Sequence, residues 1–213
     1  MAKNSGKAVP DTAKESFAYK FCVSVCKWFL VSLLTYLCSI PVVTMGTALC
    51  AALAVSREEY IDIREIFSSF FSRFGAYFKK TVLFFLLILL FIILQVLNLN
   101  FYQQFIESGT LLYYLVIGIS IILILAAVSI LRFYSYEVTF DEPLSFKQRL
   151  YKAFSRMMRC LPAAGILALL DIGLAATLMG APVAIPLLFL YPGFSAYLTC
   201  VLINWFENRG RKN

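Results

Sequence analysis

The sequence contains no histidine, which excludes the side chain that most often serves as a general base and is a leading metal ligand. A serine–histidine–aspartate triad is excluded for the same reason. The six cysteines include no Cys-x-x-Cys pair, so the sequence supports neither a zinc knuckle nor a redox motif. We therefore expect a protein that is not an enzyme, with no catalytic residues, no cofactor and no metal site.

Charged residues are also scarce. They make up 15% of the chain against 61% hydrophobic residues, and the mean hydropathy is +0.81. Soluble domains are about 45–50% apolar, and a helix needs about 20 apolar residues to cross a bilayer core of about 30 Å. Runs such as 81–97 and 111–131 are apolar on nearly every face, whereas barrel strands would alternate. The composition predicts an all-α, polytopic transmembrane helical bundle with five to six membrane segments.

The first apolar stretch, residues 21–55, is too long for one crossing, because a continuous helix of this length would span about 50 Å. Pro41, Thr44 and Gly46 interrupt it and predict a hairpin that crosses the membrane twice. The alternative is one long tilted helix with the N-terminus outside. A second break is predicted at Pro192 and Gly193, in the last apolar segment, and the alternative is a simple proline kink. We expect a tail at 1–20, one membrane domain at 21–206 and a tail at 207–213.

Two segments, 56–80 and 141–160, have apolar residues at spacings of three and four and polar residues between them, as amphipathic helices do. Asp62 with Glu65, and Ser145 with Gln148, are suited to capping boxes. The segments align at an offset of 83 residues, which indicates an internal repeat; the alternative is a chance match of two surface helices. We expect the apolar face of each segment either to lie in the lipid interface or to bind a partner protein. The candidate docking residues are Phe67, Phe70, Phe71, Arg73, Phe154 and Arg156.

The cations predict the orientation, because Lys and Arg collect in cytoplasmic loops. Eighteen of the nineteen lie in four regions: 1–20, 56–80, 132–160 and the stretch after 205. With six crossings all four regions face the cytoplasm, and so do both termini. We expect the lipid bilayer as the main partner, and a transporter subunit in the cytoplasm or the membrane as a further one. The sequence shows no nucleic-acid recognition motif.

Asp171 is the most informative single residue, because it lies near the middle of the apolar segment 161–179. A carboxylate at the bilayer centre costs about 2.5–3.5 kcal/mol on insertion scales and normally faces a pathway or a partner. Two interpretations are open: coupling to a proton or a substrate, or a packing role in which Asp171 bonds Lys27 or Asn204.

The run from Leu33 to Ala48, with its Pro41-x-x-Thr44-x-Gly46 motif, followed by Tyr60 and the aromatic segment 67–74, resembles the YesL-like family of bacterial membrane proteins. The resemblance implies a bacterial cytoplasmic-membrane protein associated with carbohydrate uptake or breakdown. The family has no established activity that transfers to residues here. The leading hypothesis is an accessory or permease-like component of carbohydrate uptake. The alternative is a non-transporting scaffold or sensor that binds another membrane protein.

Overall fold

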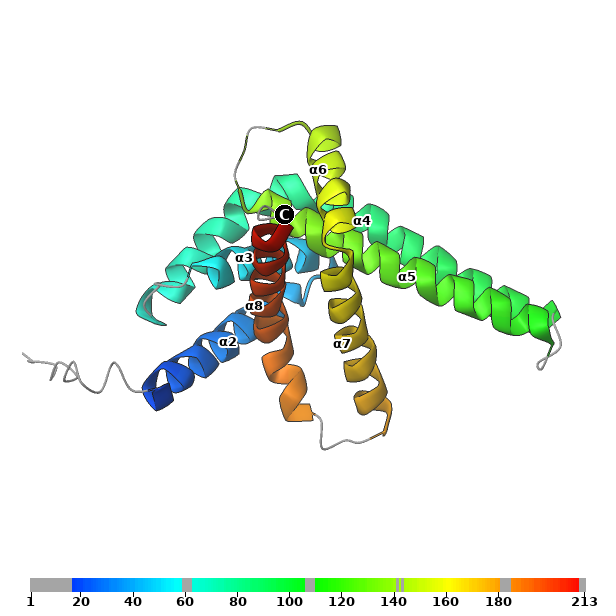
Figure 1. Ribbon diagram of the computed structural model, residues 1–213, viewed down its shortest axis with the longest axis horizontal. Coiled ribbons are helices and arrows are strands. Elements are labelled where there is room, and N and C mark those ends of the chain that lie inside the picture. Colours follow the sequence, from blue (N-terminus) through cyan, green and yellow to red (C-terminus); the bar gives the residue numbers. More distant parts are fainter. Residues whose placement is uncertain are drawn as a thin grey trace, which may run out of the picture.

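The computed structural model describes residues 17–58, 63–105, 110–140, 142, 144–180 and 185–210, and these residues form helices and connecting turns without a β-strand (Figure 1). The elements, in chain order, are α2 (Phe17–Ser39), η1 (Val42–Thr44), α3 (Met45–Arg57), η2 (Ile63–Glu65), α4 (Ile66–Phe105), α5 (Leu111–Val138), α6 (Phe146–Arg159), α7 (Leu161–Gly180) and α8 (Ile185–Gly210). The all-α prediction is confirmed.

Helix α3 lies at the centre of the molecule and contacts α2, α4, α5 and α8. Its small residues make this position possible, because they let neighbouring backbones approach closely. Every residue from Gly46 to Val55 is buried except Leu49, which is half-buried. The spacing of Gly46, Cys50 and Ala54 therefore marks a packing face, as the sequence indicates.

The hairpin predicted within 21–55 is present, but its second limb is short. Helix α2 ends at Ser39, and α3 has only 13 residues, or about 20 Å at 1.5 Å per residue. This is less than the hydrocarbon thickness of about 30 Å. Helix α3 is thus an apolar helix folded back into the bundle rather than a full-length span.

Helices α4 and α5 form a long antiparallel hairpin that projects from the rest of the molecule, while α7 and α8 form a second one (Figure 1). Helix α4 has 40 residues and runs without a break through the predicted amphipathic segment and the following span. In the second predicted copy, α6 and α7 are separate helices that meet at 88°. The two copies of the predicted repeat therefore differ in geometry.

Pro162 explains the difference. It occupies the second position of α7, where its missing N–H is not needed, but its ring prevents α6 from continuing in a straight line. At the predicted offset of 83 residues, the first copy has Lys79 at this position, and α4 continues. The capping box of Ser145 and Gln148 at the start of α6 is confirmed. Asp62, of the other predicted box, lies outside the described residues.

Four helices in the described part of the chain are long and apolar enough to cross a membrane, or five if the bent α6–α7 pair counts as one span. Large apolar side chains cover their outer faces: Leu90, Leu97 and Leu111, for example, are all more than half exposed. Such faces are unfavourable in water and are typical of lipid-facing helices. The helices are those of a membrane protein.

Candidate functional site: the Arg132 cavity

An ion pair between Arg132 and Asp171 lies inside the helical bundle. The Arg132 Nη2 atom is 3.0 Å from Asp171 Oδ1, and it also donates a hydrogen bond of 3.0 Å to Ser195 Oγ. The Tyr191 hydroxyl donates to the same Asp171 oxygen. The two charged side chains are 17% and 22% exposed, so the pair is largely removed from solvent. These four side chains connect α5, α7 and α8.

The continuation of α5 beyond Leu131 brings Arg132 into the bundle. Phe133, Tyr134 and Tyr136 are almost fully buried, and the Tyr134 hydroxyl donates to the Lys80 carbonyl of α4 at 2.9 Å. The helix therefore continues to Val138, which is six residues, or about 9 Å, past Arg132. Arg132 thus belongs to the inner part of a span rather than to the loop that follows it.

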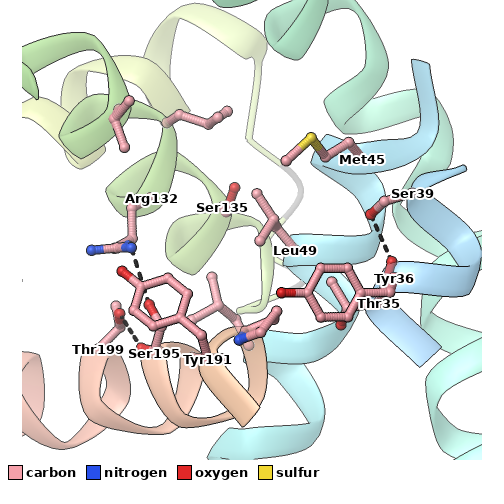
Figure 2. A pocket seen from close by; sticks show the side chains of 15 residues that line it. Thr35, Tyr36, Ser39, Met45, Leu49, Arg132, Ser135, Tyr191, Ser195 and Thr199 are labelled. Carbon is pink, nitrogen blue, oxygen red and sulfur yellow. Dashed lines mark hydrogen bonds between the residues drawn. The ribbon is translucent and has the colours of Figure 1, made fainter. Parts of the chain in front are cut away.

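Beside this ion pair is a cavity of about 230 Å³, called the Arg132 cavity below (Figure 2). It lies between α2, α3, α5 and α8, and most of its surface is apolar. Polar groups enter it as hydroxyls and as the Arg132 guanidinium. Its lining residues are Thr35, Tyr36, Ser39, Met45, Leu49, Leu53, Val128, Leu131, Arg132, Ser135, Tyr191, Pro192, Ser195, Ala196 and Thr199.

Three of the hydroxyls around the cavity, those of Thr35, Ser39 and Thr199, donate to backbone carbonyls. Thr35 donates to the Val31 carbonyl at 2.7 Å, and Thr199 donates to the Ser195 carbonyl at 2.7 Å. Their oxygens can still accept hydrogen bonds. In the described part of the structure, both bonds of the Arg132 guanidinium use Nη2, so its Nη1 and Nε hydrogens are additional donors. The cavity thus offers one cationic donor and several acceptors among mainly apolar lining residues.

The partner of Asp171 differs from both partners that the sequence indicates. Asp171 bonds Arg132 and Tyr191 rather than Lys27 or Asn204. Asn204 instead accepts a hydrogen bond of 2.9 Å from the Tyr136 hydroxyl, and Lys27 lies half-buried on α2. The prediction that a mid-membrane carboxylate needs an internal partner holds, but the proposed pairs are wrong. Sequence reasoning missed Arg132 because the cation directly follows an apolar run and was assigned to the next loop.

The Pro41-x-x-Thr44-x-Gly46 motif forms the turn between α2 and α3, so the predicted break at this point is confirmed. The Thr44 hydroxyl donates to the Cys38 carbonyl and to the Pro41 carbonyl, the latter at 2.7 Å, which closes the turn. A Cβ atom added to Gly46 would lie 2.6 Å from the Phe85 Cβ of α4. Pro41, Thr44 and Gly46 thus have structural roles, in the turn between α2 and α3 and in the packing of α3 against α4.

The second predicted break is wrong, because α8 continues through Pro192 and Gly193. Gly193 instead marks the point where α8 crosses α2. Its backbone N–H donates to Ser32 Oγ at 2.8 Å, and an added Cβ would lie 2.2 Å from the Trp28 carbonyl oxygen. Only glycine permits this approach.

The candidate docking residues divide into two groups. Phe67, Phe71 and Phe154 are each about half exposed, whereas Phe70 is fully buried. The two arginines are held by internal ion pairs: Arg73 with Glu58, and Arg156 with Glu137 at 2.6 Å and Glu207 at 2.7 Å. Both arginines therefore have carboxylate partners within the chain, Arg156 at largely buried positions and Arg73 with the half-exposed Glu58.

The ion pairs of Arg156 tie together the charged end of the molecule, defined here by Arg57, Arg73, Glu137, Arg156 and Glu207. Arg156 joins α6 to the C-terminal ends of α5 and α8, and its guanidinium lies 4.9 Å from the centre of the Phe140 ring. At the surface nearby, Lys152 donates to Glu142 at 2.5 Å, and this hydrogen bond lowers the pKa of the Glu142 carboxyl.

A family model described as "Protein of unknown function, DUF624" matches residues 24–99, about a third of the chain. The matched part runs from α2 through the turn motif and α3 to the span in α4, and so includes the Gly46–Phe85 contact. Neither the curated proteins nor the solved structures yield a match. Over this third, the chain is similar to an uncharacterised family.

Proposed function

We propose that this protein is a permease-like or accessory component of carbohydrate uptake in a bacterial cytoplasmic membrane, and that a small hydroxylated solute binds in the Arg132 cavity. The observation that carries the proposal is a guanidinium inside a span that bonds Asp171 and Ser195 and also lines the Arg132 cavity. Ionisable groups within spans generally mark substrate or ion pathways. The resemblance to YesL-like proteins supplies the carbohydrate context.

The chemistry of the cavity is suited to a sugar. Hydroxyl groups of a sugar donate to and accept from Ser, Thr and Arg side chains, while its apolar C–H face packs against aromatic rings. Tyr36 and Tyr191 supply rings from α2 and α8 (Figure 2). A volume of about 230 Å³ is below the range of about 300–1,000 Å³ typical of drug-sized ligands, which favours a solute the size of a monosaccharide. The role is proposed to be binding without catalysis.

The orientation follows from the cations. We propose that both termini, the segment 57–80 and the whole of α6 face the cytoplasm, because these regions hold seventeen of the nineteen lysines and arginines, all except Lys27 and Arg132. Helix α3 then returns the chain to the cytoplasmic side without spanning the full bilayer. The number of membrane crossings is therefore even, as it must be for both termini to face the cytoplasm.

A binding experiment in lipid nanodiscs tests the solute site. We expect at least one monosaccharide from a panel of hexoses and pentoses to bind by isothermal titration calorimetry. Ser195→Val should abolish binding, because it removes a hydroxyl that lines the cavity and accepts from Arg132. Ser72→Ala, at the charged end and outside the cavity, is the matched control and should bind normally. Absence of binding for the whole panel, or equal binding by Ser195→Val, would count against the proposal.

A second candidate function is a non-transporting scaffold or sensor that contacts another membrane protein. The half-exposed side chains of Phe67, Phe71 and Phe154 favour it, because aromatic residues are enriched at protein interfaces. A photo-crosslinking amino acid at position 71 should then trap one partner protein in the native membrane. The same amino acid at position 122, on the lipid-facing side of α5, is the control. Crosslinks to lipid alone at position 71 would reject this role.

A further inference from the structure

A second cavity, of about 470 Å³, lies at the charged end and shares no lining residue with the Arg132 cavity. It is bounded by the C-terminal end of α3, the N-terminal third of α4 and the end of α5. Two of its lining residues, Ala54 and Ala76, have short side chains that leave room in it. Its polar lining residues are Arg57, Glu58, Ser72, Arg73, Tyr77 and Thr139. We propose that this cavity binds the phosphate group of an anionic ligand.

The two guanidinium groups carry the inference. Arg57 packs against the Phe140 ring with its Cζ 3.8 Å from the ring centre, and its Nη1 donates to Thr139 Oγ1 at 3.4 Å. This stacking fixes the plane of the guanidinium and leaves its edge, which carries the N–H donors, for a ligand. In the described part of the chain, no carboxylate lies within ion-pair distance of Arg57.

Arg73 provides the second cation. It is paired with Glu58, whose side chain is 46% exposed, so the carboxylate can turn away into solvent at little cost. Glu58 is the one acidic residue among the described lining residues. The lining thus has a surplus of positive charge, and the Ser72 hydroxyl supplies a neutral donor beside it, whereas the Thr139 hydroxyl already donates to the Tyr136 carbonyl. Planar guanidinium pairs with hydroxyls are the usual recognition elements for phosphate.

The phosphate can come from two sources that share this chemistry. One is the headgroup of an anionic lipid, since basic pockets between helices near the membrane surface bind such headgroups. The other is a soluble phosphorylated metabolite or inorganic phosphate. The site is independent of the proposed solute site, because the two cavities have no lining residue in common.

The experiment has one arm for each source. Full-length protein in detergent is titrated with inorganic phosphate at constant ionic strength, and the thermal unfolding midpoint is followed. In parallel, protein from phosphatidylcholine nanodiscs containing phosphatidic acid is examined by native mass spectrometry for retained phosphatidic acid. Stabilisation by phosphate indicates a soluble ligand, and retention of phosphatidic acid alone indicates a headgroup. Either outcome supports the site if it depends on the two arginines.

Three variants test how phosphate binding depends on these arginines, each with an expected direction of change in affinity. Arg57→Gln should weaken binding about tenfold, because it removes a charge-assisted hydrogen bond. Glu58→Gln should strengthen binding about two- to fivefold, because it removes the carboxylate that competes for Arg73. Lys147→Gln, with the same loss of charge on an exposed part of α6, should leave binding unchanged.

If Arg57→Gln does not fold, the opposite effect of Glu58→Gln still tests the proposal, since a purely structural ion pair would not bind ligand more tightly when broken. The proposal fails if the wild-type protein binds neither phosphate nor phosphatidic acid. It also fails if Lys147→Gln weakens binding as much as Arg57→Gln, or if Glu58→Gln leaves binding unchanged.

Discussion

Replacement of Asp171 by asparagine tests whether the Arg132–Asp171 pair supports the bundle. The substitution keeps the shape of the side chain but leaves the guanidinium without its counter-charge. Breaking a fully buried ion pair costs about 3–5 kcal/mol, whereas a surface pair contributes about 0–1 kcal/mol. With exposed fractions of 17% and 22%, the pair lies between these cases, nearer the buried one. We expect Asp171→Asn to lower the free energy of unfolding by about 2–3 kcal/mol.

The assay is equilibrium unfolding in detergent with a double-mutant cycle. Arg132→Met alone should cost about as much as Asp171→Asn, because it leaves the carboxylate unpaired. Arg132→Met with Asp171→Asn should cost much less than the sum of the singles, since the double variant leaves neither charge buried and unpaired. Glu142→Gln makes the same change from carboxylate to amide in an exposed pair, and it should leave the protein as stable as before. Additive costs in the cycle would refute the reasoning.

Two further predictions concern packing. Gly193→Ala should destabilise the protein by about 1–3 kcal/mol, because the new methyl group would overlap the Trp28 carbonyl where α8 crosses α2. Thermal unfolding measures this loss of stability. The control is Gly118→Ala, where nothing lies within 4 Å of the added methyl group, and it should be neutral or slightly stabilising. Arg156→Met should destabilise the C-terminal ends of α5 and α8, because it leaves the buried Glu137 carboxylate unpaired. We expect faster backbone hydrogen exchange confined to those two ends. Unchanged exchange there would contradict the prediction.

Much of the fold can be predicted from the sequence, because composition and hydrophobic periodicity are strong signals in membrane proteins. The spans, the turn at Pro41 and the capping box at Ser145 all follow from local chemistry. The length of α3 does not, because its boundary is set by packing in the middle of the bundle. The continuity of α4 was missed too: a change from amphipathic to fully apolar pattern marks a change of environment, and it does not require a break in the helix.

The candidate site was only half predictable. Asp171 is conspicuous in an apolar segment, but its partner is 39 residues earlier in the chain, and no local pattern links the two. A signal for Arg132 was nevertheless present: Phe133, Tyr134, Tyr136 and Val138 follow it and continue the apolar helix. At Pro192 the helix α8 continues instead of breaking, and the close contact of Gly193 with α2 is a tertiary feature that no local pattern indicates.

The layout in the membrane is tested most directly by labelling single cysteines in intact cells. After the native cysteines are replaced by alanine, Glu58→Cys, Lys147→Cys and Thr110→Cys are each exposed to a membrane-impermeant thiol reagent. We predict that Thr110→Cys, at the start of α5, is labelled from outside the cell, and that Glu58→Cys and Lys147→Cys are labelled only after the membrane is opened. Labelling of Thr110→Cys and Lys147→Cys from the same side of an intact membrane would contradict a bundle whose charged loops share one face.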